Sequence, residues 1–255
     1  MEQPPPEQRI PQPKILLEGT SLTSKTDTAF ALAEHPRIIG QRLHRWHIPL
    51  VSSEWETRAN AQPTKGQPGS SMITFRPEEE PWALEAFHTY LRLFELHVDY
   101  YWIVDRFHLS TISYQRTQFG RECDLRWVDE RLAAAGFRLV TLTRRPDSFE
   151  AAREERLVYS ENPWRYTDLD KLIRDQEAMR ELGAASCITS TEIDVTDLGI
   201  NETADRIIDW VEATDGMYRP PDRSEILVQP VESHVDAGCP SSTPPNDGFD
   251  IPPRQ

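Results

Sequence analysis

The sequence contains few cysteines and no long hydrophobic run. Its three cysteines, Cys123, Cys187 and Cys239, lie far apart without metal-binding spacing, which is typical of reduced thiols in the cytosol. No apolar run approaches the roughly 20 residues that a membrane span requires. Residues 1–8 are polar and rich in proline, unlike a signal peptide. We therefore expect a soluble, cytoplasmic protein that does not bind membranes.

Positive charge is also scarce. The 255 residues include 28 Lys and Arg against 42 Asp and Glu, which gives a formal net charge of −14 at pH 7. Because phosphate-rich surfaces repel such an acidic protein, general binding to nucleic acid is not expected. A local group of basic side chains inside a cleft could still bind the phosphates of a small ligand.

Several catalytic motifs are missing from the sequence. It has no Gly-x-Ser-x-Gly nucleophile motif and no Cys–His arrangement of a thiol nucleophile. Its histidines show no convincing i, i+4 pairing with carboxylates that would indicate a metal site. The function must therefore be sought in other patterns.

Proline-rich ends frame the remaining sequence. Residues 1–12 are rich in Pro and Gln, and prolines recur after Arg219. We expect disordered tails at 1–12 and 218–255 around one domain at 13–217. The polar stretch 56–81 is long for a connection, so we interpret it as a flexible insert.

Short apolar runs alternate with helical patterns through the central domain. The periodicity predicts strands at 14–17, 37–40, 101–105, 138–142 and 187–194. It predicts helices at 25–33, 81–98, 109–136, 148–159, 168–182 and 201–212. Such alternation predicts a mainly parallel, five-stranded sheet covered by helices on both faces, with ligands bound at the carboxyl ends of the strands.

A phosphate-loop pattern follows the first predicted strand. Gly19 is followed six residues later by Lys25-Thr26, as in G-x-x-x-x-G-K-[ST], although Ser24 stands where the second glycine belongs. Backbone N–H groups of such a loop and the following helix N-terminus bind anions. A lysine at an ordinary helix start is the alternative. The residues expected to bind nucleotide phosphates are Gly19, Thr20, Ser21, Leu22, Thr23, Ser24, Lys25 and Thr26.

Two further groups of charged residues follow predicted strands. Asp105-Arg106 ends the strand at 101–105, where the carboxylate could bind Mg²⁺ and the arginine a phosphate; a surface ion pair is the alternative. After the strand at 138–142 come four arginines: Arg144, Arg145, Arg153 and Arg156. We interpret about 144–167 as an arginine-bearing helical lid that closes over phosphates, the alternative being a solvated helix with Glu–Arg pairs.

In these motifs, and in their order, the sequence resembles the P-loop nucleoside and nucleotide kinases, most nearly the thymidylate-kinase-like branch. The resemblance covers roughly residues 13–215 and includes Ser110, Tyr114 and Gln115 after the Asp-Arg pair, and Asp194-x-x-Asp197 near the end of the domain. It implies the three-layer α/β/α fold of P-loop NTPases. Residues 41–80 show no motif of the family.

The resemblance also implies roles for individual residues. Thr26 and Asp105 would bind Mg²⁺, and ATP would be the phosphate donor. Arg106, Thr111, Tyr114 and Gln115 would bind the acceptor. The residues expected to take part in catalysis are Lys25, Asp105, Arg106, Arg145, Arg153 and Arg156.

These observations predict an ATP- and Mg²⁺-dependent kinase for a nucleoside, a nucleoside monophosphate or a similar small acceptor. Two alternatives stay open. One is a catalytically silent P-loop protein that binds nucleotide or a partner, which Ser24 and the proline-rich tails motivate. The other is a kinase for a non-nucleotide hydroxyl acceptor. No nucleic-acid partner is expected, and a homodimer is an open option.

Overall fold

The computed structural model describes residues 11–40, 50–51, 71–97, 100–160 and 163–218. The chain divides into two units, 1–219 and 220–255, and every described residue belongs to the first. The predicted tails lie outside the described residues except for residues 11, 12 and 218, and so does the greater part of the predicted insert.

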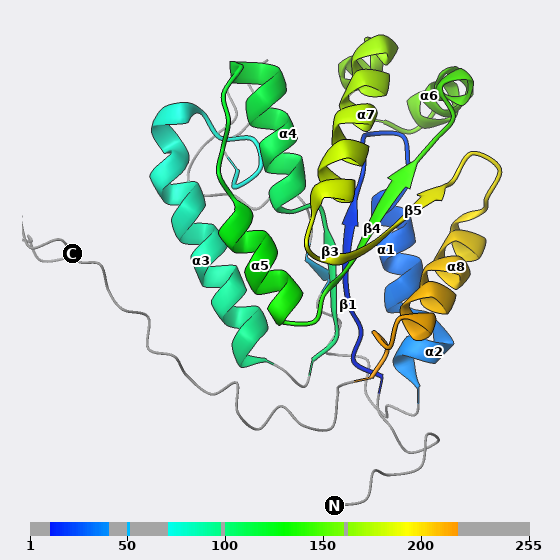
Figure 1. Cartoon of the computed structure of the whole chain (residues 1–255). Coiled ribbons are helices and arrows are strands. Elements are labelled where there is room, and N and C mark those ends of the chain that lie inside the picture. Colours follow the sequence, from blue (N-terminus) through cyan, green and yellow to red (C-terminus); the bar gives the residue numbers. More distant parts are fainter. Residues whose placement is uncertain (1–10, 41–49, 52–70, 98–99, 161–162, 219–255) are drawn as a thin grey trace, which may run out of the picture. The chain divides into compact units, whose positions relative to one another are not determined.

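A parallel sheet forms the centre of the first unit, with strand order β2-β3-β1-β4-β5 (Figure 1). β1 pairs with β3 on one side and β4 on the other, so that Leu17 lies opposite both Asp105 and Val140. The strands are β1 (Lys14–Glu18), β2 (Leu50–Val51), β3 (Trp102–Asp105), β4 (Arg138–Thr143) and β5 (Thr189–Asp194). Three strands therefore end together at one edge of the sheet.

Helices cover both faces of this sheet, which confirms the predicted three-layer α/β/α fold. In Figure 1, α3, α4, α5 and α7 lie on one side of the strands, and α1, α2 and α8 lie on the other. The helices are α1 (Lys25–Ala33), α2 (Pro36–Ile39), α3 (Glu80–Leu96), α4 (His108–Phe119), α5 (Arg126–Ala134), α6 (Phe149–Leu157), α7 (Leu169–Ala185) and α8 (Ile200–Ala213). Short 3₁₀ turns span Pro77–Glu79 (η2), Pro146–Ser148 (η3) and Pro163–Tyr166 (η4).

Each face of the sheet has its own hydrophobic core. Leu16 belongs to the core that contains Phe87 and Phe94 of α3, whereas Ile15 and Leu17 belong to the core that contains α1 and α8. All five residues of β1 are buried, as expected for a parallel strand covered on both faces. The loop after Glu18 therefore starts from a strand that is packed on both faces.

Two sequence predictions are wrong in detail. Residues 37–40, predicted as a strand, contribute to α2, because Pro36 occupies its first turn and the His35 ring accepts a hydrogen bond from the Arg37 N–H at 3.2 Å. The predicted helix 109–136 is two helices, since Gly120 ends α4 in the left-handed conformation with φ of 61°.

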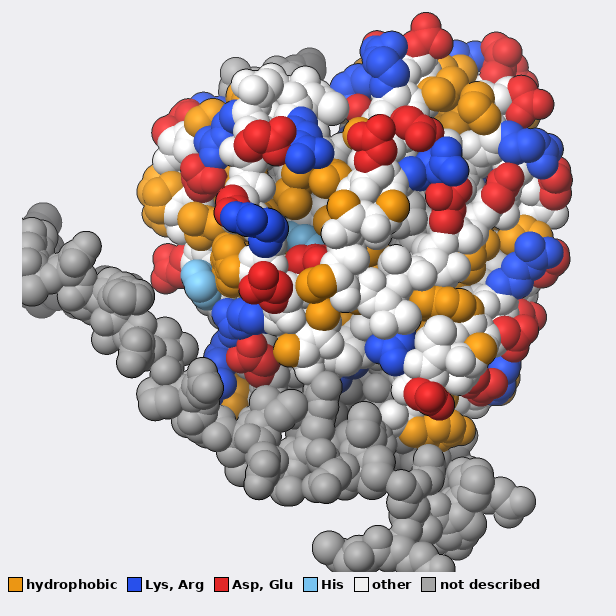
Figure 2. All heavy atoms as spheres, in the orientation of Figure 1, with side chains coloured by type: hydrophobic (Ala, Val, Ile, Leu, Met, Phe, Trp, Pro, Cys, Tyr) orange, Lys and Arg blue, Asp and Glu red, His pale blue; other side chains and the backbone are white. Residues whose placement is uncertain are grey.

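The surface of the described residues gives two further observations. None of the described helices is both long and apolar enough to cross a membrane. On the face that Figure 2 shows, acidic and basic side chains intermingle, without a broad basic patch.

The contact between α7 and β4 leads to a test of the packing. A Cβ atom at Gly183 would come within 2.8 Å of Thr141 Oγ1, a buried side chain of β4. Gly183→Ala should therefore lower the free energy of unfolding by roughly 1–3 kcal/mol in urea titrations. Gly199→Ala is the matched control, because a Cβ there meets no atom within 4 Å. Equal stabilities of the two variants would contradict this close packing.

Candidate phosphate-binding site

The chain turns sharply between the end of β1 at Glu18 and the start of α1 at Lys25. Gly19 opens the turn with φ of 140°, and a Cβ atom there would overlap the carbonyl oxygen of Leu142. Only glycine fits this contact between neighbouring strands. The Thr23 hydroxyl donates to the Thr20 carbonyl at 2.9 Å and closes the turn.

Ser24 adopts the bend that a glycine would favour. Its backbone is left-handed, with φ of 52° and ψ of 31°, at the N-cap of α1. The Ser24 carbonyl accepts the Thr28 N–H at 2.9 Å, so the helix starts normally after the bend. The backbone of Ser24 is therefore strained, because a residue with a Cβ atom disfavours the left-handed conformation.

Strained backbone is concentrated around one cavity. Among the residues that the structure describes, four non-glycine residues have positive φ, and three of them, Leu22, Ser24 and Arg106, line this cavity. The fourth, Asp215, lies after α8. Such strain persists only where the surrounding structure enforces it, and it gathers at functional sites.

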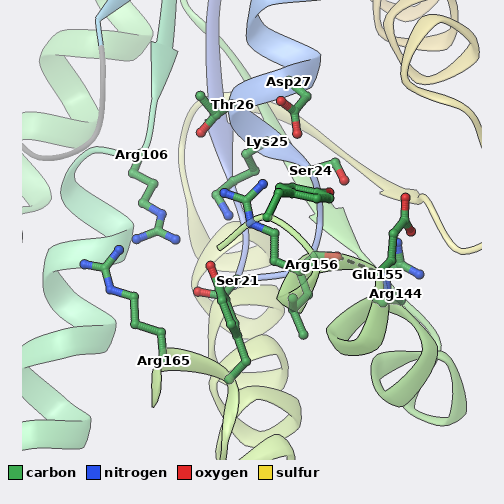
Figure 3. Close-up of a pocket in the computed structure, with 14 residues that line it drawn as sticks. Ser21, Ser24, Lys25, Thr26, Asp27, Arg106, Arg144, Glu155, Arg156 and Arg165 are labelled. Carbon is green, nitrogen blue, oxygen red and sulfur yellow. Dashed lines mark hydrogen bonds between the residues drawn. The ribbon is translucent and has the colours of Figure 1, made fainter. Parts of the chain in front are cut away.

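The cavity has a volume of about 220 Å³ and a strongly cationic lining. In Figure 3 the side chains of Arg106 and Arg165 point toward one another, and Lys25 and Arg156 also line the cavity. The basic residues of the lining are Lys25, Arg106, Arg144, Arg156 and Arg165, and the acidic residues are Asp27 and Glu155. Five cations against two carboxylates suit a polyanionic ligand.

Lys25 lies inside the loop, with 5% of its surface exposed. Its ammonium donates to the Thr20 carbonyl and lies 3.4 Å from the Thr23 hydroxyl. Burial, followed by repulsion from Arg106, lowers the pKa of Lys25 to about 7, although Asp105 and Glu18 partly oppose this. A bound anion would replace these uncharged partners and stabilise the charged lysine.

Thr26 lines the cavity and contacts Asp105, which is buried and is not part of the lining. The Thr26 hydroxyl donates to Asp105 Oδ2 at 2.6 Å. The other carboxylate oxygen, Oδ1, is buried and has no hydrogen-bond partner within the described ranges. A hydroxyl beside a carboxylate with an unused oxygen fits Mg²⁺, which takes few protein ligands and completes its shell with phosphates and water.

The segment predicted as a lid, about 144–167, contributes three arginines and two tyrosines to the cavity lining: Arg144, Arg156, Arg165, Tyr159 and Tyr166. The Arg156 guanidinium lies 5.1 Å from the centre of the Tyr159 ring. Burial opposes ionisation of Tyr166, but hydrogen bonds with Arg156 and Ser160 outweigh it, and the pKa of Tyr166 is lowered. Arg156 is thereby oriented toward the loop side of the cavity (Figure 3).

Arg144 links β4 to the phosphate loop. Its Nε donates to the Leu22 carbonyl at 3.1 Å, and burial lowers the pKa of its guanidinium. The buried Gln176 side chain bonds both the N–H and the carbonyl of Arg144, each at 2.8 Å. This fixed backbone holds the guanidinium against the left-handed turn at Leu22.

Two of the predicted lid arginines lie outside the cavity lining. Arg145 pairs with Asp197 in the connection between β5 and α8, and Arg153 pairs with Glu150 on its own helix at 3.2 Å. Sequence reasoning missed Arg165, which reaches the cavity from the 3₁₀ turn η4. Its sequence neighbourhood, Pro-Trp-Arg-Tyr, carries no phosphate-binding pattern.

Of the residues predicted to bind the acceptor, Arg106 lines the cavity, whereas the other three lie elsewhere. Thr111 and Gln115 are fully buried, and their side chains donate to the carbonyls of Met72 at 3.1 Å and Phe75 at 2.8 Å. They hold the segment before η2 against α4. Tyr114 is half-buried, and burial, then Glu79, raises its pKa. None of the three lines the cavity.

No family model matches this sequence, and no curated protein matches it. Solved structures do match. The YorR protein of Bacillus subtilis, crystallised with phosphorylated GDP, has a TM-score of 0.52 at 19% identity, over 80% of this chain and 99% of YorR. The thymidylate kinase of Candida albicans has a TM-score of 0.47 at 14% identity, over 81% of this chain and 93% of the enzyme. The likeness to YorR shows that the two chains share a fold.

The strain at Ser24 predicts an unusual effect of glycine. Because glycine adopts the left-handed conformation without the steric cost of about 1–2 kcal/mol, Ser24→Gly should raise the free energy of unfolding in urea titrations. Ser148→Gly is the matched control, since Ser148 precedes α6 with a right-handed φ of −91° and should lose stability. Equal losses in both variants would show that the bend at Ser24 is not strained.

Burial of Lys25 predicts a pH dependence of stability. Because its folded pKa of about 7 lies below the ordinary value of 10.5, the unfolded chain binds more protons between these pH values, and stability rises with pH across that window. From pH 7 to pH 9 the wild type should gain roughly 1–3 kcal/mol over Lys25→Met, measured by urea unfolding. Parallel pH profiles would contradict a buried, destabilised ammonium.

Proposed function

We propose that the protein is an ATP-dependent, Mg²⁺-assisted phosphotransferase that acts on a nucleoside, a nucleoside monophosphate or a similar small acceptor. The observation that carries the proposal is the hydrogen bond from Thr26 to the buried Asp105, whose second carboxylate oxygen has no partner among the described residues. Thr26 and the neighbouring Lys25 line a cavity that is also lined by four arginines. A metal–triphosphate complex is bound by a hydroxyl and a carboxylate that hold the metal and by a lysine that contacts the phosphates.

The phosphate loop would bind the donor. Backbone N–H groups of residues 19–24 and the N-terminus of α1 would surround the β- and γ-phosphates, with Lys25 as the charged contact. Thr26 and Asp105 would hold Mg²⁺, which when bound neutralises phosphate charge as it builds up during transfer. Asp105 could instead accept the proton of an acceptor hydroxyl.

The lid would act on the transferring phosphoryl group. Transfer forms a bond between the acceptor oxygen and the γ-phosphorus and breaks the bond from that phosphorus to the β,γ-bridging oxygen, which leaves ADP. Arg156 and Arg165 of the lid would neutralise the three γ-oxygens and exclude water. Arg145 and Arg153 stay candidates for this role only if the lid changes position.

The surplus of cations favours an acceptor that is itself an anion. Arg106 reaches the cavity from the β3–α4 turn, whereas Lys25 and Arg144 contact the donor loop. A nucleoside monophosphate would supply the second anionic group. Because YorR was crystallised with phosphorylated GDP, guanine nucleotides belong in any panel of acceptors.

A silent nucleotide-binding protein is the second candidate. The strained Ser24 and the hydrogen bond from Lys25 to the Thr20 carbonyl favour it, because both must yield before the loop surrounds a triphosphate. For either candidate, the partner that we propose is a small molecule and the location is the cytoplasm.

The two candidates are separated by turnover. The protein is incubated with Mg-ATP and matched acceptor pairs, thymidine with thymidine monophosphate and guanosine with GMP, and ADP is quantified. We expect ADP formation with a monophosphate, and a loss of about 100-fold or more in Lys25→Ala. Tight binding of a non-hydrolysable ATP analogue without turnover on any acceptor would instead favour the silent binding protein.

A further inference from the structure

Glu18 is a buried carboxylate that the proposed mechanism does not use. It is the last residue of β1, directly before the phosphate loop, and its exposed surface is 0%. No Lys, Arg or His of the described ranges forms an ion pair with it. A buried charge without an ion pair is costly, so its hydrogen bonds must compensate.

Among the described residues, the hydrogen-bond donors to this carboxylate come from the start of α4. Oε1 accepts the N–H groups of Phe107 at 2.9 Å and Ser110 at 3.3 Å, and Oε2 accepts the Ser110 hydroxyl at 2.5 Å. The N-cap residue, Phe107, has no side chain that could cap the helix. Glu18 therefore caps α4 from another strand, where the helix dipole also favours a negative charge.

Arg106 lies between two anchors on β1. Its own N–H donates to the Leu17 carbonyl at 2.8 Å, and the next N–H, of Phe107, donates to Glu18. Arg106 has a left-handed φ of 65°, which a free arginine would avoid. The last two residues of β1 thus hold the backbone that directs the Arg106 side chain into the cavity.

We propose that Glu18 is a positioning residue for Arg106. By fixing the start of α4 it holds the strained turn, and it ties this wall of the cavity to the strand that leads into the phosphate loop. Without this carboxylate the turn relaxes, and the Arg106 guanidinium leaves its place opposite Arg165. The proposal rests on the proposed function only in that the cavity must bind a polyphosphate.

Two substitutions separate hydrogen bonding from charge at this position. In Glu18→Gln the amide oxygen can accept both N–H groups, and the Ser110 hydroxyl can rotate to accept from the amide nitrogen. Glu18→Met has a similar length but accepts no hydrogen bond. The glutamine variant should therefore keep the position of Arg106, and the methionine variant should lose it.

The test is a double-mutant cycle on the affinity for tripolyphosphate, measured by titration calorimetry. We expect Arg106→Ala to weaken binding about 10-fold or more, the usual effect of losing a charged hydrogen bond. Glu18→Met should weaken it by a similar factor, and the double variant should bind no more weakly than Arg106→Ala alone. Glu18→Gln should stay within about 3-fold of the wild type, as a conservative rescue.

Controls distinguish positioning from general destabilisation. Glu79 is also buried, at 2% exposure, and its carboxylate accepts the Arg76 N–H at 3.0 Å, but it does not line the cavity. Glu79→Met should lower the melting temperature without changing the affinity. If Glu18→Met does not fold, Ser110→Ala takes its place in the cycle.

Each outcome decides the proposal. Losses that add in the double variant, or an equal loss of affinity in Glu79→Met, would show that Glu18 does not act through Arg106. Wild-type protein that does not bind tripolyphosphate would contradict the proposed function itself, and the role of Glu18 would fall with it. A non-additive cycle with rescue by glutamine supports the assignment.

Discussion

Parallel pairing of β1 with both β3 and β4 is the constraint from which the site follows. The register places Leu17 opposite Asp105 on one side and Val140 on the other, so the chain leaves all three strands at the same edge of the sheet. The phosphate loop, the Asp105-Arg106 turn and the start of the lid therefore meet, although more than 100 residues separate the first from the last. Residues of the two neighbouring strands also contact the loop directly, through the Leu142 carbonyl against Gly19 and through the Thr26–Asp105 hydrogen bond.

Two features of the site lower the stability of the folded protein. Left-handed backbone at Leu22, Ser24 and Arg106 costs of the order of 1–3 kcal/mol at each residue, and the buried Lys25 ammonium lies near the positive charge of Arg106. The two hydrophobic cores on either side of the sheet must offset both costs. An anionic ligand would relieve the repulsion, since phosphate oxygens accept hydrogen bonds from the groups that now repel one another. The same physical features that lower stability therefore favour binding of a polyphosphate.

Much of the fold could be predicted from the sequence, because hydrophobic periodicity and strand–helix alternation are local signals. The meeting of Thr26 with Asp105 was also expected from the sequence, since Asp105 ends one predicted parallel strand and Thr26 follows the loop after another. Other features depend on tertiary contacts that no local pattern encodes. Arg165 enters the cavity because the 3₁₀ turn η4 places it there. Thr111 and Gln115 bind backbone carbonyls of the segment before η2 instead of facing the cavity. The strand expected at 37–40 became α2 because Pro36 and the His35 ring start a helix.

Binding of a triphosphate by the loop around Lys25 is the claim on which the function depends. Phosphorus NMR of ATP, titrated with the protein in the presence of Mg²⁺, tests it most directly because each phosphate gives its own signal. Saturable shifts of the β- and γ-phosphorus signals that exceed the shift of the α-phosphorus, and that are absent with Lys25→Ala, are the expected result. Unchanged signals at saturating protein, or the same shifts with the alanine variant, would show that this loop does not enclose phosphates.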